Sequence, residues 1–135
     1  MNCIFCKILN GDIPSNKVFE NENFIAILDA FPANEGHILV IPKKHFENIF
    51  EIDEETLKEG YAIAKKIANS IKKSLNIENI NILQNNGTLA GQTVNHFHIH
   101  IIPRIENDNV VIKSEPVNID SERIKKIVNN IKSNI

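Results

Sequence analysis

The sequence has few of the features that mark fibrous, disordered or strongly charged chains. Its 135 residues include five glycines, five prolines and no tryptophan, which excludes a collagen-like or low-complexity chain. The net charge of −2 argues against a strongly basic surface that binds nucleic acid. No apolar run approaches the roughly 20 residues of a membrane span, and the N-terminus lacks the pattern of a secretion signal. We therefore expect a cytoplasmic protein that binds neither nucleic acid nor a membrane.

Cysteine is also scarce. The only two cysteines lie close together, as Cys3 and Cys6, and in a reducing cytoplasm they are not expected to form a structural disulfide. Two interpretations stay open on the residues alone. The thiols could pack like small apolar side chains, or they could be half of a tetrahedral zinc site that needs two more ligands. Nothing in the sequence indicates a redox cofactor.

The hydrophobic pattern predicts a single α+β domain over residues 1–135. Residues 17–28 are typical of a β-hairpin, because a polar turn separates two short apolar stretches. An apolar stripe at helical spacing predicts a long amphipathic helix over residues 53–75, and a weaker stripe predicts another over 121–133. Further strands are expected at 37–42, 79–83 and 96–102. Strands in the middle of the chain, with helices apart from them, favour an antiparallel sheet.

Three of the five histidines alternate along the chain, at His96, His98 and His100. Alternate side chains of a strand share a face, so the three imidazoles would point the same way, about 6.6 Å apart along the strand. The apolar residues between them would then face the core. Rings this close are expected to titrate as a coupled group, which leaves neutral imidazoles available for chemistry.

Three interpretations of this histidine group can be considered. It could be a half-buried, hydrogen-bonded face without chemistry, a transition-metal site, or a histidine nucleophile that attacks phosphorus while its neighbours handle protons. Three histidines in register, shortly after the loop residues 91–93, favour chemistry over the first interpretation. The residues alone leave the metal and the nucleophile both open.

The segment from His96 to Ile102 has the pattern His-φ-His-φ-His-φ-φ, with φ apolar, and it resembles the signature of the histidine triad (HIT) family. Other segments resemble the Hint-like branch of that family: 3–8, 11–15, 28–29, 36–45 and 85–87. The resemblance covers about residues 3–104, and the C-terminal extension, 105–135, carries no motif. It implies the HIT fold, with an antiparallel sheet of about five strands, one long helix and one or two shorter helices. It also implies a homodimer with a continuous sheet.

The resemblance further implies the catalytic residues. His98 corresponds to the nucleophile, which would form a nucleotidyl-histidine intermediate, and His100 would contact the phosphate. His37 corresponds to an upstream histidine that supports His98. Thr93 stands where the branch commonly has serine, and it keeps the hydroxyl that would bind the phosphate or the leaving group.

Binding residues are implied in the same way. Asp29 corresponds to the acid that hydrogen-bonds the ribose hydroxyls. The loop residues that would hold phosphate and ribose are Asn85, Gly91, Gln92 and Thr93.

The N-terminal cysteine pair resembles that of zinc-binding members of the family. In those members the other two ligands correspond to a histidine after a Pro-Lys pair and to the first histidine of the triad. The implied structural zinc site is Cys3, Cys6, His45 and His96.

The activity that the resemblance implies is hydrolysis of a purine nucleotide of the AMP or GMP type at its α-phosphate. Nucleoside 5′-phosphoramidate is the substrate class most expected. A dinucleoside polyphosphate hydrolase is an alternative enzyme, and a non-catalytic nucleotide-binding regulatory protein or a zinc-binding interaction module are alternatives of other classes.

Overall fold

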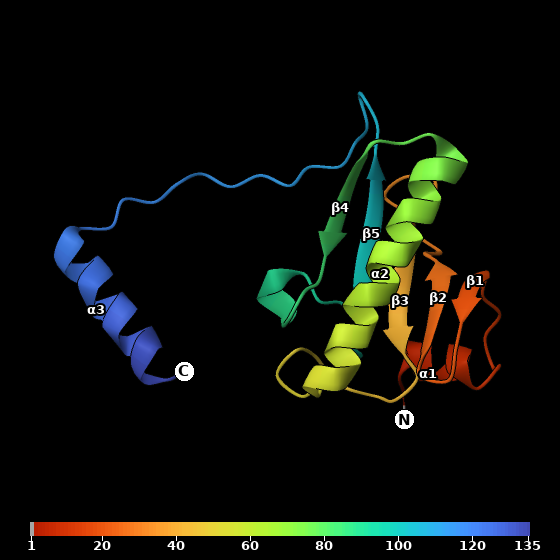
Figure 1. The fold of residues 1–135 in the computed structure, drawn as a ribbon, viewed down its shortest axis with the longest axis horizontal. Coiled ribbons are helices and arrows are strands. Elements are labelled where there is room, and N and C mark those ends of the chain that lie inside the picture. Colours follow the sequence, from red (N-terminus) through yellow and green to blue (C-terminus); the bar gives the residue numbers. More distant parts are fainter. Residues whose placement is uncertain (1) are drawn as a thin grey trace.

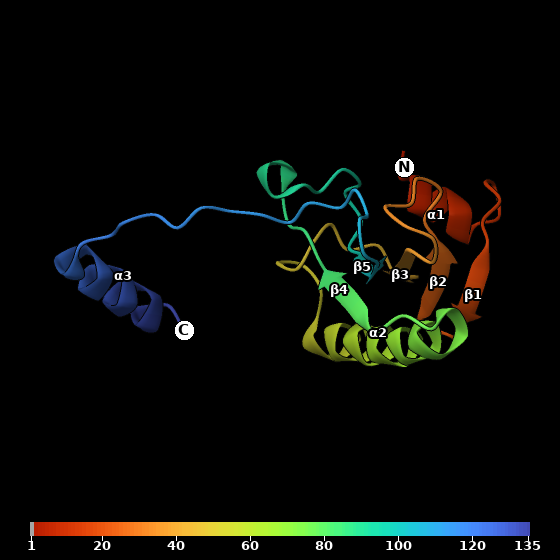
Figure 2. The same ribbon diagram turned by 90° about the horizontal axis from the view of Figure 1, so that it is seen from above.

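The structure, a computed structural model, describes residues 2–135 and shows an antiparallel sheet with helices on both faces (Figures 1 and 2). The five strands lie in the order β1-β2-β3-β5-β4, so β1 and β4 form the two edges. This arrangement confirms the predicted α+β class and the sheet of five strands. The elements in chain order are α1 (Ile4–Leu9), β1 (Lys17–Glu20), β2 (Phe24–Leu28), β3 (Ile38–Pro42), α2 (Glu54–Leu75), β4 (Asn79–Leu83), the 3-10 turn η1 (Thr88–Ala90), β5 (Ile99–Arg104) and α3 (Ser121–Ser133).

Helix α2 covers one face of the sheet and confirms the long helix predicted from the apolar stripe (Figure 2). It begins after Asp53, whose carboxylate accepts a hydrogen bond from the Thr56 amide at 3.0 Å. It ends at Asn76, which adopts the left-handed conformation with φ of 54°. The buried residues that it packs on the sheet repeat at helical spacing: Ile63, Ala64, Ile67 and Ile71.

Helix α1 lies on the other face and was not expected from the sequence. Its six residues are too few to show a helical period, and the tertiary contacts of Phe5 hold it in place. Phe5 packs with the buried residues Ile25, Leu39 and Ile41, which point away from α2. The sheet therefore separates two apolar clusters, and α1 covers the smaller one.

Strand β5 begins at Ile99, three residues later than predicted. The preceding residues bend, because the Phe97 amide donates to the carbonyl of Phe46, at 2.7 Å, and not to a neighbouring strand. The alternation of side chains nevertheless continues through the bend. Phe97, Ile99 and Ile101 are all buried in the cluster under α2, as expected, and the three histidines face the side of α1.

The C-terminal extension forms an arm, residues 109–135, that leaves the sheet after β5. Its helix α3 confirms the helix predicted over 121–133 but stands apart from the rest of the molecule (Figures 1 and 2). Most apolar side chains of α3 remain exposed, with Ile124 at 48% and Ile131 at 57% of their surface. None of the helices within residues 2–135 has the length and apolar character needed to cross a membrane.

Candidate active site and metal centre

A pocket of about 490 Å³ opens on the α1 side of the sheet, over the three neighbouring strands β2, β3 and β5. Apolar side chains from α1 and β2 form most of its wall, including Ile8 and Ile27. The pocket is also lined by four of the polar residues that the sequence singled out: Asp29, Thr93, His98 and His100. The pocket thus offers an apolar surface for a planar group next to hydrogen-bonding groups for a charged one.

The backbone sets the proton position on His98. Its Nδ1 lies 2.7 Å from the carbonyl oxygen of His96, and a carbonyl only accepts hydrogen bonds. Nδ1 therefore carries the proton in the neutral ring, and Nε2 keeps its lone pair. This buried ring lines the pocket, so the free lone pair is that of a nucleophile or a base.

The tautomer of His100 is set by a chain of two hydrogen bonds that starts at the Ala33 amide and passes through His37. The Ala33 amide donates to Nδ1 of His37 at 2.9 Å, so the proton of His37 is on Nε2. That Nε2 lies 2.9 Å from Nδ1 of His100, which must accept the hydrogen bond. Nε2 of His100 therefore carries a proton and is a donor. His98 and His100, with ring centroids 4.8 Å apart, present one acceptor and one donor next to each other.

Asp29 completes this group from the end of β2. Its Oδ2 lies 3.5 Å from Nε2 of His37, and its Oδ1 accepts a hydrogen bond from the Phe31 amide at 2.9 Å. The Asp29 amide in turn donates to the carbonyl of His37 at 2.9 Å. The turn between β2 and β3 therefore holds the carboxylate and the imidazole together.

Burial is the main cause that shifts the titration of these rings. It lowers the pKa of His37 and of His98 below the ordinary value, and it lowers that of His100 to about 4. The Asp29 carboxylate acts against burial on all three histidines, but the pKa shift is still downward. The imidazoles are therefore neutral near pH 7, and burial contributes more to this than the mutual repulsion on which the prediction was based.

Gln92 is a buried residue in the connection between β4 and β5. Its side-chain amide donates to the carbonyls of Glu47 and Val94, at 2.7 and 3.0 Å, and its oxygen accepts from the Gly87 amide at 2.8 Å. Each of its polar atoms thus has a protein partner, and the side chain pins the loop to the segment after β3.

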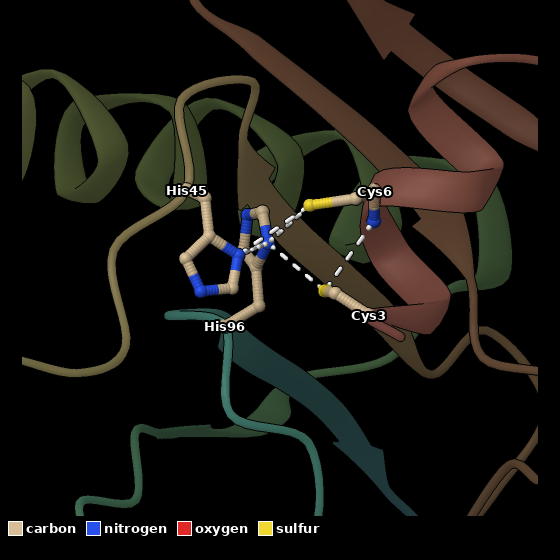
Figure 3. A group of neighbouring side chains, drawn as sticks. All are labelled: Cys3, Cys6, His45 and His96. Carbon is tan, nitrogen blue, oxygen red and sulfur yellow. Dashed lines mark hydrogen bonds between the residues drawn. The ribbon is translucent and has the colours of Figure 1, made fainter. Parts of the chain in front are cut away.

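A second cluster lies beside the pocket, at the N-terminus of α1 (Figure 3). Cys3 is the N-cap residue of α1, Cys6 lies in its first turn, His45 comes from the loop after β3, and His96 from the bend before β5. The four potential ligand atoms all lie within 4.8 Å of one another. The sequence predicted this set only through the resemblance, because its members are up to 93 residues apart.

The spacing of these atoms fits a tetrahedral zinc ion. The Sγ atom of Cys3 lies 3.4 Å from Nδ1 of His96, and that of Cys6 lies 3.4 Å from Nδ1 of His45. The two Nδ1 atoms are 3.0 Å apart. Ordinary zinc–sulfur and zinc–nitrogen bonds at tetrahedral angles give edges of about 3.5 Å and about 3.3 Å for such pairs. In addition, Nε2 of His96 donates to the carbonyl of Pro42 at 2.8 Å, which leaves its Nδ1 lone pair for a metal.

The structure brings most of the predicted site residues into these two groups. His98, His100, Thr93 and Asp29 share the pocket, and the cysteines and histidines predicted for zinc form the second cluster, which could hold a metal ion. His37 lies behind the pocket and contacts His100 rather than His98. Asn85, Gly91 and Gln92 do not line the pocket; the side chain of Asn85 instead donates to the carbonyl of Gly91 at 3.4 Å.

Sequence reasoning missed the groups that set the histidine tautomers. The Ala33 amide and the carbonyls of Pro42 and His96 are backbone atoms, so no side-chain pattern marks them. It also missed Phe5, whose ring lies edge-on to His96 and His98 with centroids 5.8 and 5.0 Å away. Phe5 thus lies between the candidate metal site and the pocket.

Comparison with known proteins agrees with this architecture. The sequence pattern of the HIT domain family matches residues 10–107. An uncharacterized HIT-like protein of Methanocaldococcus jannaschii is 47% identical over 125 residues, which are 92% of this chain and 96% of that protein. The adenosine 5′-monophosphoramidase of Schizosaccharomyces pombe is 45% identical over 104 residues, or 77% of this chain and 75% of the yeast protein.

Solved structures are similar over the whole chain. The crystal structure of a HIT family member from Bacillus subtilis is 41% identical and superposes with a TM-score of 0.90, covering 100% of this chain and 98% of that one. A zinc-bound histidine triad family protein from Mycobacterium smegmatis is 34% identical, with a TM-score of 0.78 and coverage of 100% and 99%.

Proposed function

The chain belongs to the HIT family, and from that premise we propose that it hydrolyses nucleoside 5′-phosphoramidates and releases a purine nucleoside monophosphate such as AMP or GMP. The observation that carries the proposal is the pair of oriented imidazoles: a free lone pair on Nε2 of His98 beside an N–H on Nε2 of His100. A site that only bound nucleotides would not need the free lone pair on His98. The fission-yeast relative named for adenosine 5′-monophosphoramidase activity supports the substrate class.

The first step of the proposed reaction is attack by Nε2 of His98 on the α-phosphorus. A phosphorus–nitrogen bond to His98 forms while the bond from phosphorus to the leaving amine breaks, and the amine leaves with a proton from solvent. The ring of His98 becomes positively charged, because its Nδ1 keeps its proton. The hydrogen bond from Nδ1 to the His96 carbonyl, at 2.7 Å, stabilises that charge.

In the second step water attacks the same phosphorus atom. The bond to His98 breaks, the nucleoside monophosphate leaves, and the water's second proton passes to solvent. The N–H of His100 and the Thr93 hydroxyl are the groups of the pocket that would bind phosphate oxygens or the leaving group. Asp29 would bind the ribose hydroxyls, and the roles of Asn85, Gly91 and Gln92 toward phosphate remain predictions.

We also propose that Cys3, Cys6, His45 and His96 hold one structural zinc ion. The ion would join α1 to the bend that carries His98, so that the pocket wall and the nucleophile keep their relative positions. The zinc-bound relative from M. smegmatis and the tetrahedral spacing support this. Thiolate ligands persist in a reducing compartment, which agrees with the expected cytoplasmic location.

A homodimer with a continuous sheet is part of the proposal. Within residues 2–135, strand β4 pairs with β5 alone, which leaves its outer edge available to the β4 of a second copy. Edge strands of this kind pair readily with another strand.

The experiment that tests the activity measures AMP release from adenosine 5′-phosphoramidate by wild type and by His98→Ala. We expect the substitution to lower the rate on the order of 10³-fold or more, because it removes the nucleophile. Binding of AMP by both proteins, measured by calorimetry, controls for an intact pocket. The matched variant Thr93→Ser keeps the hydroxyl and should retain the activity.

The possible results separate the alternatives. Release that survives His98→Ala would show that His98 is not the nucleophile. A wild type that binds AMP but releases none would favour another leaving group, as in a dinucleoside polyphosphate, or a regulatory nucleotide-binding protein. A wild type that binds no AMP would remove the nucleotide from the proposal.

A further inference from the structure

The arm exposes an apolar face for which its own domain provides no cover. On α3, apolar side chains recur at helical spacing, and all are exposed except the half-buried Ile127: Ile124, Ile127, Val128 and Ile131. The polar residue Asn129 lies on the opposite side of the helix. An isolated helix of 13 residues is marginally stable in water, so packing of this face is needed to keep it folded.

The direction in which the arm leaves the sheet is built into the structure. At its root, Arg104 holds the buried carboxylate of Asp108 by two hydrogen bonds of 2.8 and 2.9 Å, and it also donates to the Val110 carbonyl at 2.9 Å. A third hydrogen bond to Asp108, at 2.9 Å, comes from Asn34. A further one joins Arg104 to Asn81 of β4 at 2.8 Å. The root is thus attached to the edge strand, and it directs the chain outward over that edge.

The reach of the arm suits a contact outside its own domain. Residues 111–120 are exposed and contain neither helix nor strand. Ten extended residues span roughly 33–36 Å, whereas a compact domain of this size has a radius of gyration of about 13 Å. In both views the arm departs on the β4 side of the sheet, the side where a second copy would pair (Figures 1 and 2).

The same side of the domain carries an exposed apolar patch, which we define as Ile49, Phe50 and Leu89. Their side chains are 37%, 86% and 106% exposed. The Ile49 amide donates to Oδ1 of Asn86 at 2.8 Å, so the loops that carry the patch are joined. Both loops lie toward the β4 side in the two views (Figures 1 and 2). Large exposed apolar side chains on joined loops are typical of an interaction surface.

The charges around the patch and on α3 are complementary. Five acidic residues and no basic residue occur in 47–55: Glu47, Glu51, Asp53, Glu54 and Glu55. Helix α3 has four basic residues and one acidic residue. An apolar helix face bordered by lysines therefore matches an apolar patch bordered by carboxylates.

The course of the arm is shared with a relative. Residues 105–135 are nearly a quarter of the chain, and the B. subtilis crystal structure superposes over all of it with a TM-score of 0.90. That score requires the arm to follow a similar path in both proteins. A helix without a packing partner would not keep one position in two proteins that are 41% identical.

We propose that the arm docks on a second copy of this chain, with the apolar face of α3 on the partner's patch of Ile49, Phe50 and Leu89. The two-fold symmetry of a homodimer makes the exchange reciprocal, so each chain donates one arm and receives one. This inference rests on the proposed homodimer and is independent of the proposed reaction.

Crosslinking between two complementary variants tests the exchange. One chain carries Glu47→Gln and Glu51→Gln, the other carries Lys125→Gln and Lys126→Gln, and the two are co-expressed. A carbodiimide, which joins amines to carboxylates without a spacer, is then applied and the linked peptides are identified by mass spectrometry. We expect a link between residues 125–126 and 47–51 in wild type and in the co-expressed pair, and none in either variant alone.

The outcomes decide whether the arm docks on the second copy or on its own chain. A link present in wild type but absent from the co-expressed pair would show that the arm folds back on its own chain. Its absence from wild type would show that the patch is not the docking surface. A monomeric wild type in sedimentation equilibrium would refute the homodimer and the exchange together, whereas a dimer without the link would refute the exchange alone.

A matched pair of substitutions measures what the apolar face contributes. Val128→Asp and Asn129→Asp add the same charge at adjacent positions, the first on the apolar face and the second opposite to it. We expect Val128→Asp to raise the dimer dissociation constant at least about tenfold relative to Asn129→Asp, because it buries a charge against apolar groups. Equal dissociation constants for the two variants would overturn the proposal.

Discussion

The tautomer relay behind the pocket makes a prediction that separates positioning from chemistry. In the structure the Ala33 amide orients His37, and His37 donates to Nδ1 of His100 at 2.9 Å. The substitution His37→Ala removes this donor, so His100 can place its proton on Nδ1. Its Nε2 would then face the phosphate with a lone pair in place of an N–H.

The expected magnitude follows from the bond that is lost. A hydrogen bond between neutral groups contributes about 1 kcal/mol net, and this corresponds to about a fivefold loss in kcat/KM. The loss is small compared with that expected for His98→Ala, since the nucleophile and its lone pair are retained. His37→Gln should recover most of the activity, because the glutamine amide nitrogen occupies the place of Nε2 and can donate to His100.

Steady-state kinetics on adenosine 5′-phosphoramidate measures these losses, and nitrogen NMR of the His100 ring reports its tautomer. We expect Nε2–H on His100 in wild type and in His37→Gln, and a mixture of tautomers in His37→Ala. A loss in His37→Ala as large as that in His98→Ala would refute the relay, because it would give His37 a direct chemical role. An unchanged kcat/KM together with a mixed tautomer would refute it equally.

Three further predictions concern the metal centre, the titration and the core. Protein purified without chelator should contain about one zinc per chain by elemental analysis, and Cys3→Ser should lower that content; a zinc-free wild type would contradict the metal centre. Because burial lowers the pKa of folded His100 from 6.5 to about 4, the unfolded chain binds more protons between these values. The free energy of unfolding in urea should therefore fall as the pH drops from 6.5 toward 4 and stay level above that window, and a rise on acidification would contradict the buried neutral ring. Phe24→Ala, at a fully buried position, should lower the free energy of unfolding by about 3–5 kcal/mol, while Phe31→Ala, at 90% exposure, should change it by less than about 0.5 kcal/mol; similar losses would mean that the core is placed wrongly.

The local pattern of the sequence was sufficient for most of the regular elements. The helix over 53–75 was predictable because its apolar residues repeat at helical spacing, and the strand over 79–83 because it is a short apolar segment; both are confirmed. The alternation around Phe97 was also predictable, since one face of that segment is apolar. In each case a single element carries its own signal, and packing only completes it.

Tertiary structure decided the details on which the chemistry depends. Helix α1 has one buried residue, Phe5, which holds it on the sheet. Strand β5 starts late because the Phe97 amide donates a hydrogen bond to the carbonyl of Phe46, in a distant loop. The contact of Gln92 with phosphate stays a prediction, and the structure adds that its side chain bonds to the backbone of Glu47, Gly87 and Val94. The family resemblance indicated the identity of the site residues but not these contacts.

The histidines show most clearly what the sequence determines and what only the folded chain determines. Their alternation, visible in the sequence, places three rings on one side of the chain. Which nitrogen of each ring carries the proton depends on backbone groups that only folding brings close: the carbonyl of Pro42 for His96, and the amide of Ala33, through His37, for His100. Every residue has a backbone carbonyl and every residue except proline an amide N–H, so the sequence cannot mark the ones that matter. Their positions in the folded chain fit the roles proposed for the three imidazoles, which are a metal ligand, a nucleophile and a donor.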